Sequence, residues 1–359
     1  MKARVLIVDD SVVIRRVLSQ ALGSHPDIEV VGTAANGQIG LAKIAQLEPD
    51  VVTMDIEMPV LDGLETLAEL RKTHPRLPVI MFSTLTERGG QATLKALSLG
   101  ASDYLTKPSQ TESPGEAIEQ VKDDLIARIL ALTGRGEAPV RTPSPAPARP
   151  RDPQPGRVDI VAIGVSTGGP NALAEIFPRL PADLPVPIVL VQHMPPLFTR
   201  LLAERLDSVS PLKVSEASDG QVIAPGTAWI APGNFHMTVE RSGTDVVLRT
   251  HQGAPENSCR PAVDPLFRSV ASVYGRHTLA VILTGMGQDG KKGCEVLHEL
   301  GAQIIVQDRA SSVVWGMPSA VALNGLAQAE LPLNAIADEI GLRTRAHRTS
   351  RTRRSLASS

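Results

Sequence analysis

The sequence is poor in cysteine and has no long apolar run. Its 359 residues include two cysteines, Cys259 and Cys294, which form neither a CxxC pair nor a disulfide-dense pattern. This spacing predicts no zinc site and is typical of a reducing compartment, so we expect both to be ordinary small apolar side chains. No run approaches the roughly 20 apolar residues of a membrane span, and the N-terminus shows no signal-peptide cleavage region. We therefore expect a cytoplasmic protein.

Positive charge is scarce in the parts of the chain that have a globular composition. Residues 1–132 carry 18 acidic and 13 basic groups, and residues 158–340 carry 18 acidic and 12 basic groups. The basic excess lies in the segment 133–157 and in the tail 341–359, which has six arginines and no acidic residue. Acidic globular parts argue against a large phosphate-binding surface, so we expect no nucleic-acid partner.

The segment 133–157 contains seven prolines and hardly any large apolar side chain. Such a segment cannot bury enough surface to fold, and it predicts a semi-rigid spacer between two domains, 1–132 and 158–340. The tail 341–359 is also too polar to pack. It is either an electrostatic contact for an acidic partner or nucleic acid, or a solvated terminus.

Five apolar runs in the first domain alternate with helix-patterned segments. The runs are residues 3–8, 28–34, 50–54, 78–83 and 102–105. Between the first two, Ser11 is placed to cap a helix whose apolar residues recur with a 3.6-residue spacing. The alternation predicts an α/β fold with a parallel, doubly wound sheet.

Charged and hydroxyl side chains stand where these runs end. They are Asp9, Asp10, Asp55, Ser83 and Lys107. The carboxyl ends of parallel strands share one edge of a sheet, so these groups are expected to converge. Clustered carboxylates suit octahedral Mg²⁺, and a metal ion with Lys107 can neutralise a phosphoryl group in transit. Asp55 would then be its acceptor.

The first domain resembles the receiver domain of response regulators, which implies a flavodoxin-like fold. The resemblance rests on VDDS at 8–11, MDIEMPVLDGL at 54–64, the hydroxyl of Ser83 and YLTKP at 104–108. It implies that Asp55 is the phosphoacceptor and that a histidine kinase is the phosphodonor. It also implies that Mg²⁺ is held by Asp10, Asp55 and the carbonyl of Glu57, with Asp9, Ser83 and Lys107 supporting the phosphorylation site.

The second domain begins with a glycine-rich turn, GVSTGGP at 164–170, after the apolar run 158–163. A buried strand that ends in glycines and restarts as a helix presents Ser166 at the carboxyl edge of a sheet. The turn is a nucleophile elbow, a closely packed turn, or a phosphate-binding helix N-terminus. A dinucleotide site is disfavoured, because Ser166 stands where GxGxxG needs its second glycine.

Two further strand ends complete a possible catalytic set. His193 follows the apolar run 187–191, and Asp289 lies in the glycine-rich turn after the run 279–283. The imidazole can take the proton from Ser166 during attack on a carbonyl, and the carboxylate can orient the imidazole. Backbone NH groups of the turns can hold an oxyanion. The chain order Ser, His, Asp differs from that of α/β-hydrolases, so we expect a mainly parallel sheet of another topology.

Residues 158–340 resemble the catalytic domain of chemotaxis protein-glutamate methylesterases, the CheB family. The matching pieces are GVSTGGP, QHMP at 192–195, APGNFHM at 231–237, CRPAVDPLF at 259–267, TGMGQDG at 284–290 and WGMPSA at 315–320. The resemblance implies hydrolysis of γ-glutamyl methyl esters on chemoreceptors and deamidation of receptor glutamines, with no cofactor for the esterase step. It implies that Ser166, His193 and Asp289 form the catalytic triad and that the backbone NH of Met286 is an oxyanion donor.

Together these features predict a monomeric hydrolase whose substrate groove is obstructed by the receiver domain until Asp55 is phosphorylated. A DNA-binding response regulator and a catalytically inactive scaffold stay open as other classes. Four residues either border the substrate groove or have structural roles, namely Arg260, Asp264, Trp315 and Met317. A second histidine, His236, is expected to be structural or to lie on the substrate side.

Overall fold

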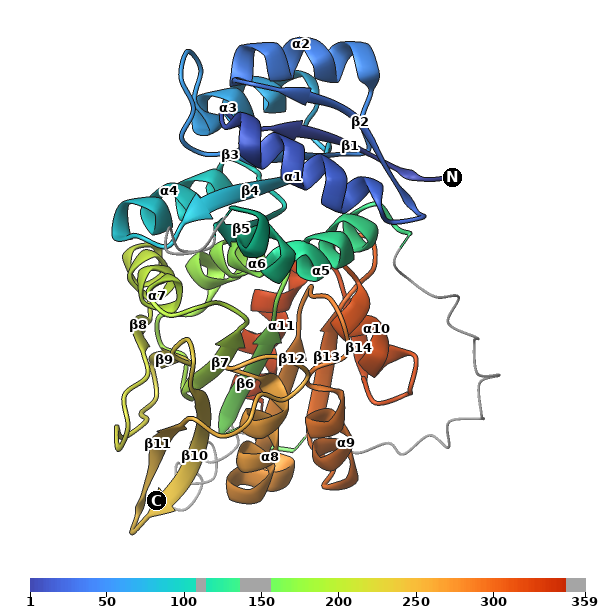
Figure 1. Ribbon diagram of the computed structural model, residues 1–359. Coiled ribbons are helices and arrows are strands. Elements are labelled where there is room, and N and C mark those ends of the chain that lie inside the picture. The colour runs from blue at the N-terminus through green and yellow to red at the C-terminus, as the bar shows by residue number, and fades with distance from the viewer. Residues whose placement is uncertain (108–113, 136–155, 347–359) are drawn as a thin grey trace, which may run out of the picture. The chain divides into compact units, whose positions relative to one another are not determined.

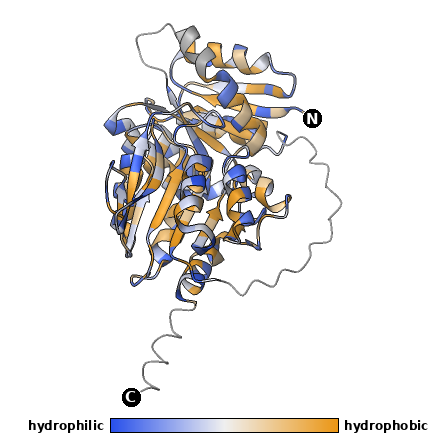
Figure 2. Ribbon diagram, turned by 90° about the horizontal axis from the view of Figure 1, so that it is seen from below, coloured by the Kyte–Doolittle hydropathy of each residue, from blue (hydrophilic) through white to orange (hydrophobic). Residues whose placement is uncertain are grey.

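The computed structural model describes residues 1–107, 114–135 and 156–346, and it divides into two compact units, residues 1–140 and 141–359 (Figure 1). Most of the expected spacer, the tail from residue 347 and Pro108 lie outside the described residues. Both units are built on sheets whose strands are mostly hydrophobic (Figure 2). Among the described residues, none of the helices has both the length and the apolar character that a membrane span requires.

The first unit is a five-stranded parallel sheet with the order β2-β1-β3-β4-β5. Its strands are β1 (Ala3–Val8), β2 (Ile28–Ala34), β3 (Val51–Asp55), β4 (Val79–Thr84) and β5 (Asp103–Lys107). Its helices are α1 (Val12–Gly23), α2 (Gly37–Leu47), α3 (Gly63–Thr73), α4 (Glu87–Ser98) and α5 (Pro114–Leu132). Helices α1 and α5 pack together, as do α2, α3 and α4, so the predicted doubly wound α/β fold is confirmed.

Local signals in the first unit position its functional edge. Ser11 caps α1 as predicted, since its side chain accepts a hydrogen bond from the NH of Ile14. Helix α3 begins directly against the end of β3, where a Cβ on Gly63 would lie 2.1 Å from the carbonyl oxygen of Asp55. Glycine at this position therefore permits the close approach of α3 to the strand that carries Asp55.

The second unit contains a seven-stranded parallel sheet with the order β14-β13-β12-β6-β7-β9-β8. Its strands are β6 (Ile160–Val165), β7 (Ile188–Gln192), β8 (Lys213–Glu216), β9 (Thr227–Ile230), β12 (Thr278–Ile282), β13 (Gln303–Gln307) and β14 (Ala329–Leu331). An antiparallel hairpin is formed by β10 (His236–Ser242) and β11 (Asp245–His251). Strand β6 lies in the middle of the sheet, and later strands extend the sheet on both sides of it. This mainly parallel sheet agrees with the predicted α/β class.

Helices cover both faces of the seven-stranded sheet. They are α6 (Gly169–Ile176), η1 (Phe177–Arg179), α7 (Phe198–Val209), α8 (Val263–Tyr274), η2 (Gly275–His277), α9 (Lys291–Glu299), α10 (Gly316–Ala322) and α11 (Leu333–Arg345). Helix α9 packs against both α8 and α10, and α6 contacts both α7 and α11. The core beneath α8 includes Leu266, Phe267 and Val270, all fully buried against the strands. This packing fixes the start of α8, which borders the site described below.

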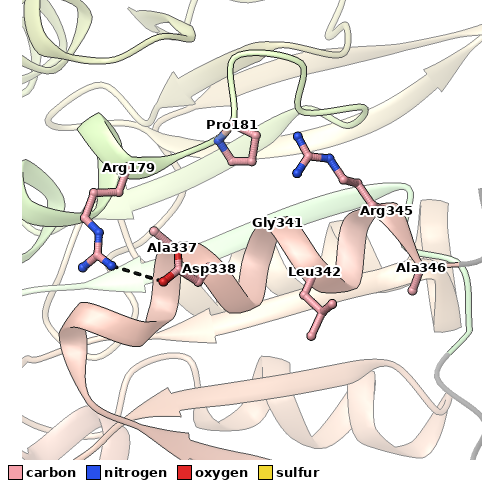
Figure 3. Close-up of a pocket in the computed structure, with 8 residues that line it drawn as sticks. All are labelled: Arg179, Pro181, Ala337, Asp338, Gly341, Leu342, Arg345 and Ala346. Atoms are coloured by element: carbon pink, nitrogen blue, oxygen red, sulfur yellow. Dashed lines mark hydrogen bonds and ion pairs between the residues drawn. The ribbon is translucent and has the colours of Figure 1, made fainter.

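The end of α11 differs from the expected tail at residues 341–359, because the helix continues to Arg345. Thr344 is buried, and Arg343 donates to Glu339 and to Gln303. A groove of about 510 Å³ lies between α11 and the segment around Pro181. Figure 3 shows the residues that line it, with the ion pair of Arg179 and Asp338 at one end. Arg345 is paired with Asp183, so the last turn of α11 belongs to the folded unit.

Candidate active site

Three adjacent strands of the second unit bring Ser166, His193 and Asp289 into hydrogen-bonding distance. Strand β6 pairs with β7 on one side and β12 on the other, and each of the three residues follows one of these strands. The Oγ of Ser166 is 3.1 Å from Nδ1 of His193, and Nε2 of His193 is 2.8 Å from Oδ2 of Asp289. The sheet thus places a hydroxyl, an imidazole and a carboxylate in one continuous chain of contacts.

The turn after β6 has little room for side chains around Ser166. Its NH donates to the carbonyl of Thr284, and its carbonyl accepts from Gly169 and from the side-chain amide of Gln192. Gly168 has φ of 78°, and a Cβ on Gly169 would lie 1.9 Å from Oε1 of Gln192. The glycines therefore allow the sharp turn into α6 that presents the serine hydroxyl.

Asp289 is buried and receives hydrogen bonds from the start of α8. Its Oδ2 accepts from the NH of Val263 at 2.6 Å, and its Oδ1 accepts from the NH groups of Asp264 and Gly290 at 3.1 and 2.9 Å. Burial raises the pKa of the carboxyl, but the hydrogen bonds and the charge of His193 outweigh burial and lower it. Asp289 is therefore an anion that faces His193.

The pKa of His193 is raised to about 9. Burial of the imidazole lowers this pKa, but the hydrogen bonds to Asp289 and Cys259 outweigh burial. The imidazolium form of His193 therefore predominates at neutral pH, and the fraction of neutral imidazole increases as the pH approaches 9.

The end of the receiver sheet holds a second polar cluster. Ligand oxygens of Asp9, Asp10 and Asp55 lie within 4.8 Å of one another, and Nζ of Lys107 is 2.6 Å from Oδ2 of Asp55. A cavity of about 300 Å³ beside them is lined by Asp10, Ile56, Glu57, Phe82, Thr84 and Gly89 together with Asp55, Ser83 and Lys107. The structure thus brings the sequence-predicted residues of the first unit to one edge.

The carboxylates of this cluster suit a hard cation. Burial raises the pKa of Asp55 to about 6 against the opposing effect of Lys107, and burial also raises the pKa of Asp9. The buried Oδ2 of Asp9 is 3.5 Å from Lys107 and has no closer hydrogen-bond partner within the described residues. Lys107 offsets only part of the cost of burying these two negative charges. Their carboxylate oxygens are the kind of ligand that Mg²⁺ prefers.

Comparison with known proteins agrees with this geometry. Residues 161–340 match the family model for CheB methylesterase, and residues 5–119 match the model for the response regulator receiver domain. A protein-glutamate methylesterase/protein-glutamine glutaminase of Trichodesmium erythraeum is 53% identical over 348 residues, covering 94% of this chain and 98% of that protein. The chain belongs to the CheB methylesterase family.

Two further relatives support the assignment to the CheB family. A protein of the same name from Nocardioides is 51% identical over 348 residues and covers 94% of both chains. The crystal structure of the Thermotoga maritima CheB methylesterase catalytic domain has a TM-score of 0.51 and 44% identity, covering 52% of this chain and 99% of that one. The output domain is thus of the methylesterase class, and the DNA-binding alternative is not supported.

Cys259 does not behave as the ordinary apolar side chain that we expected in this CheB family member. Its Sγ lies 3.5 Å from Nδ1 of His193, the same ring nitrogen that contacts Ser166. Composition and spacing carried no signal for this contact, because it depends on how the turn that contains Cys259 folds back onto His193, 66 residues away in sequence. Cys294 is fully buried in the core, and burial raises the pKa of its thiol well above its usual range.

The sequence left open whether five residues border the substrate groove or have structural roles, and in the structure all five make structural contacts. Nδ1 of buried His236 accepts from the NH of Ala262, and the opposite ring nitrogen donates to the carbonyl of Ala254. The guanidinium of Arg260 donates to Asn234 and to two loop carbonyls.

The other three side chains are also engaged. Met317 is fully buried, and the indole NH of Trp315 donates to the carbonyl of Gln307. The carboxylate of Asp264 is buried and accepts from the NH of Gly293. Each of these contacts braces a loop or helix that surrounds the triad.

Proposed function

We propose that this chain is a phosphorylation-activated protein-glutamate methylesterase and protein-glutamine glutaminase that acts on chemoreceptors. The observation that carries the proposal is the contact chain from Ser166 through His193 to Asp289 at three adjacent strand ends. The family match over the whole catalytic unit supports the same chemistry.

The proposed reaction is acyl transfer to water. Nδ1 of His193 takes the proton of Ser166 as Oγ attacks the γ-carbonyl carbon, and it then passes this proton to the leaving methanol. Water attacks the resulting ester of Ser166, again with His193 as base, and releases the γ-carboxylate. A glutamine side chain follows the same steps with ammonia as the leaving group. Asp289 stabilises the imidazolium through Nε2.

The backbone NH of Met286 is proposed as an oxyanion donor. The turn that carries it lies against the nucleophile, since a Cβ on Gly285 would be 2.8 Å from Cβ of Ser166. Gly287 has φ of 82°, and within the described residues the NH of Met286 has no hydrogen-bond acceptor. A free NH beside the serine can therefore stabilise the tetrahedral intermediate.

The receiver domain is proposed to accept a phosphoryl group on Asp55 from a histidine kinase. Asp10, Asp55 and the carbonyl of Glu57 would hold Mg²⁺, which neutralises phosphoryl oxygens when bound, and Asp9 belongs to the same cluster. Lys107 already contacts the Asp55 carboxylate and is placed to pair with the phosphoryl group. Ser83 now donates to the carbonyl of Gly89, so phosphorylation would compete for its hydroxyl.

Methanol release from methylated receptor membranes tests the proposal. The full chain should release methanol faster after treatment with a small acyl phosphate and Mg²⁺, and Asp55→Asn should abolish the increase. Ser166→Ala should release none above background. Equal release by Ser166→Ala and the unchanged protein would refute the esterase.

Inhibition by the receiver domain is tested by comparing the isolated catalytic fragment with the unphosphorylated full chain. A fragment of residues 156–359 should hydrolyse the esters faster than the unphosphorylated full chain, because a tethered inhibitor acts at a local concentration on the order of millimolar. The Thermotoga catalytic domain was crystallised as a separate domain, which supports the use of this fragment. A fragment no faster than the full chain would rule out inhibition.

A further inference from the structure

A tight turn lies between the β10–β11 hairpin and α8, next to the triad. The NH of Glu256 donates to the carbonyl of Cys259 at 3.1 Å, and the NH of Cys259 donates back to Glu256 at 2.9 Å. The two central residues, Asn257 and Ser258, have φ of 51° and 61°. Positive φ at both positions defines a type I′ turn, which favours asparagine at the first of them.

The side chain of Asn257 joins two buried carboxylates. Its Nδ2 donates to Oδ1 of Asp289 at 2.8 Å and to Oδ2 of Asp264 at 3.0 Å. These carboxylates are only 2% and 1% exposed. An amide nitrogen carries two hydrogens, so each carboxylate receives one of them.

The donor matters because the two carboxylates are neighbours of the same charge. Two nearby buried carboxylates tend to share a proton, and a donor between them favours the form in which both are ionised. The pKa of Asp264 is already raised, first by burial and also by the charge of Asp289. Among the described residues, the charged groups that act on the pair include His193 and Arg268, and Arg268 forms an ion pair with Glu256 at 2.6 Å. The buried thiol of Cys294 also faces Asp264.

We propose that Asn257 is a positioning residue for the triad, which keeps Asp289 ionised and keeps its Oδ2 directed at His193. The proposal rests on the proposed esterase function. Asn257 satisfies Oδ1, so Oδ2 is left to His193 and the NH of Val263. The remaining donors to Oδ1 among the described residues are backbone NH groups, so Asn257 is the side chain by which this support can be removed.

The turn offers a clean deletion and a matched control. Asn257→Gly removes the amide and keeps a residue that accepts positive φ. Ser258→Gly makes the same change at the next position, whose φ is also positive and whose side chain is not among the hydrogen-bond partners of the triad within the described residues. Both residues are exposed, so neither substitution opens a cavity.

The test uses the full chain, activated by a small acyl phosphate and Mg²⁺. We expect Asn257→Gly to lower kcat/KM for methanol release about 10- to 100-fold, mostly in kcat, because a hydrogen bond to a charged group is lost. The acid limb of its pH profile should move to lower pH, since a proton shared by the carboxylates weakens the negative charge beside His193. Ser258→Gly should match the unchanged protein in both measurements.

A double substitution separates positioning from a general effect of the turn. Asp264→Asn removes the like charge, so the pair Asn257→Gly with Asp264→Asn should recover part of the lost kcat/KM. An unchanged kcat/KM in Asn257→Gly would overturn the proposal. So would a loss without a shift of the acid limb and without recovery in the double variant.

Labelling of Ser166 by a fluorophosphonate keeps this inference separate from the substrate assignment. The reagent reports the reactivity of the Ser166–His193 pair whatever the natural substrate is. If the unchanged protein is labelled but releases no methanol from receptor membranes, the proposed substrate fails. Slower labelling of Asn257→Gly than of Ser258→Gly would still support the role of Asn257, and equal labelling would overturn it.

Discussion

His193 contacts Asp289 through Nε2 and Ser166 through Nδ1. In the chymotrypsin-type triad the carboxylate holds Nδ1 and the serine faces Nε2, so the imidazole is used here in the opposite sense. In the proposed mechanism the proton-accepting atom is therefore the ring nitrogen nearer the backbone, and the thiol of Cys259 lies beside that same atom.

The raised pKa of His193 predicts a strong pH dependence of hydrolysis. Only the neutral imidazole can accept the serine proton, and the pKa is about 9. The kcat/KM of the phosphorylated full chain should rise about tenfold per pH unit below that value and then level off. Methanol release across this range measures it, with Ser166→Ala as the correction for alkaline hydrolysis. A profile that is already flat at pH 7 would contradict the assignment.

Substitution of Asp289 should have a far larger effect than substitution of Asp264. Asp289→Asn cannot stabilise the imidazolium and should lower kcat by about 10⁴. Asp264→Asn, which has no contact with His193 among the hydrogen bonds of the described residues, should lower it much less. Steady-state kinetics with circular dichroism as a folding check distinguishes the two. Equal losses would mean that the carboxylates act as one unit.

The buried Asp55 predicts a stability that depends on pH. Its folded pKa of about 6 lies above the usual value of 3.8 for an aspartate, so the folded receiver binds more protons between these values. The free energy of unfolding should therefore fall as the pH rises through this interval, by about 3 kcal/mol in all. Urea unfolding in chelator measures this dependence, which Asp55→Asn should reduce. A variant with the same pH dependence as the unchanged protein would contradict the assignment of this titration to Asp55.

Cys259 should be the reactive thiol of the two. It is partly exposed beside His193, whereas Cys294 is fully buried and the pKa of its thiol is raised well above its usual range. We expect iodoacetamide to label Cys259 first and to inactivate the esterase, because the added group would occupy the space around Nδ1. Peptide mapping and residual activity measure this. Cys259→Ser should retain activity and resist inactivation, and an equally sensitive Cys259→Ser variant would exclude this site.

Much of the architecture was predictable from sequence. The runs at 3–8 and 28–34 coincide with β1 and β2, and the run at 50–54 lies one residue before β3. Buried parallel strands are continuous apolar runs, and their polar ends share one edge, so local sequence carries this information.

Two features could not be predicted in the same way. The contacts of Asn257 and Cys259 depend on how a turn folds back onto strands far away in sequence. The asparagine in that turn indicates positive φ but not which carboxylates its amide meets. The arginine-rich composition of residues 341–359 concealed the last turn of α11, although the buried Ile336, Ile340 and Thr344 recur at four-residue intervals.

The hydrogen bonds between Asp289 and the first NH groups of α8 have an evolutionary consequence. Ala262 precedes that helix and offers no capping side chain, so the aspartate supplies the cap from a distant segment. Such a cap stabilises a fold by about 1 kcal/mol, independently of any chemistry. A homologue that had lost its activity would therefore still be under selection to retain the aspartate, and the serine is the better marker of a working enzyme.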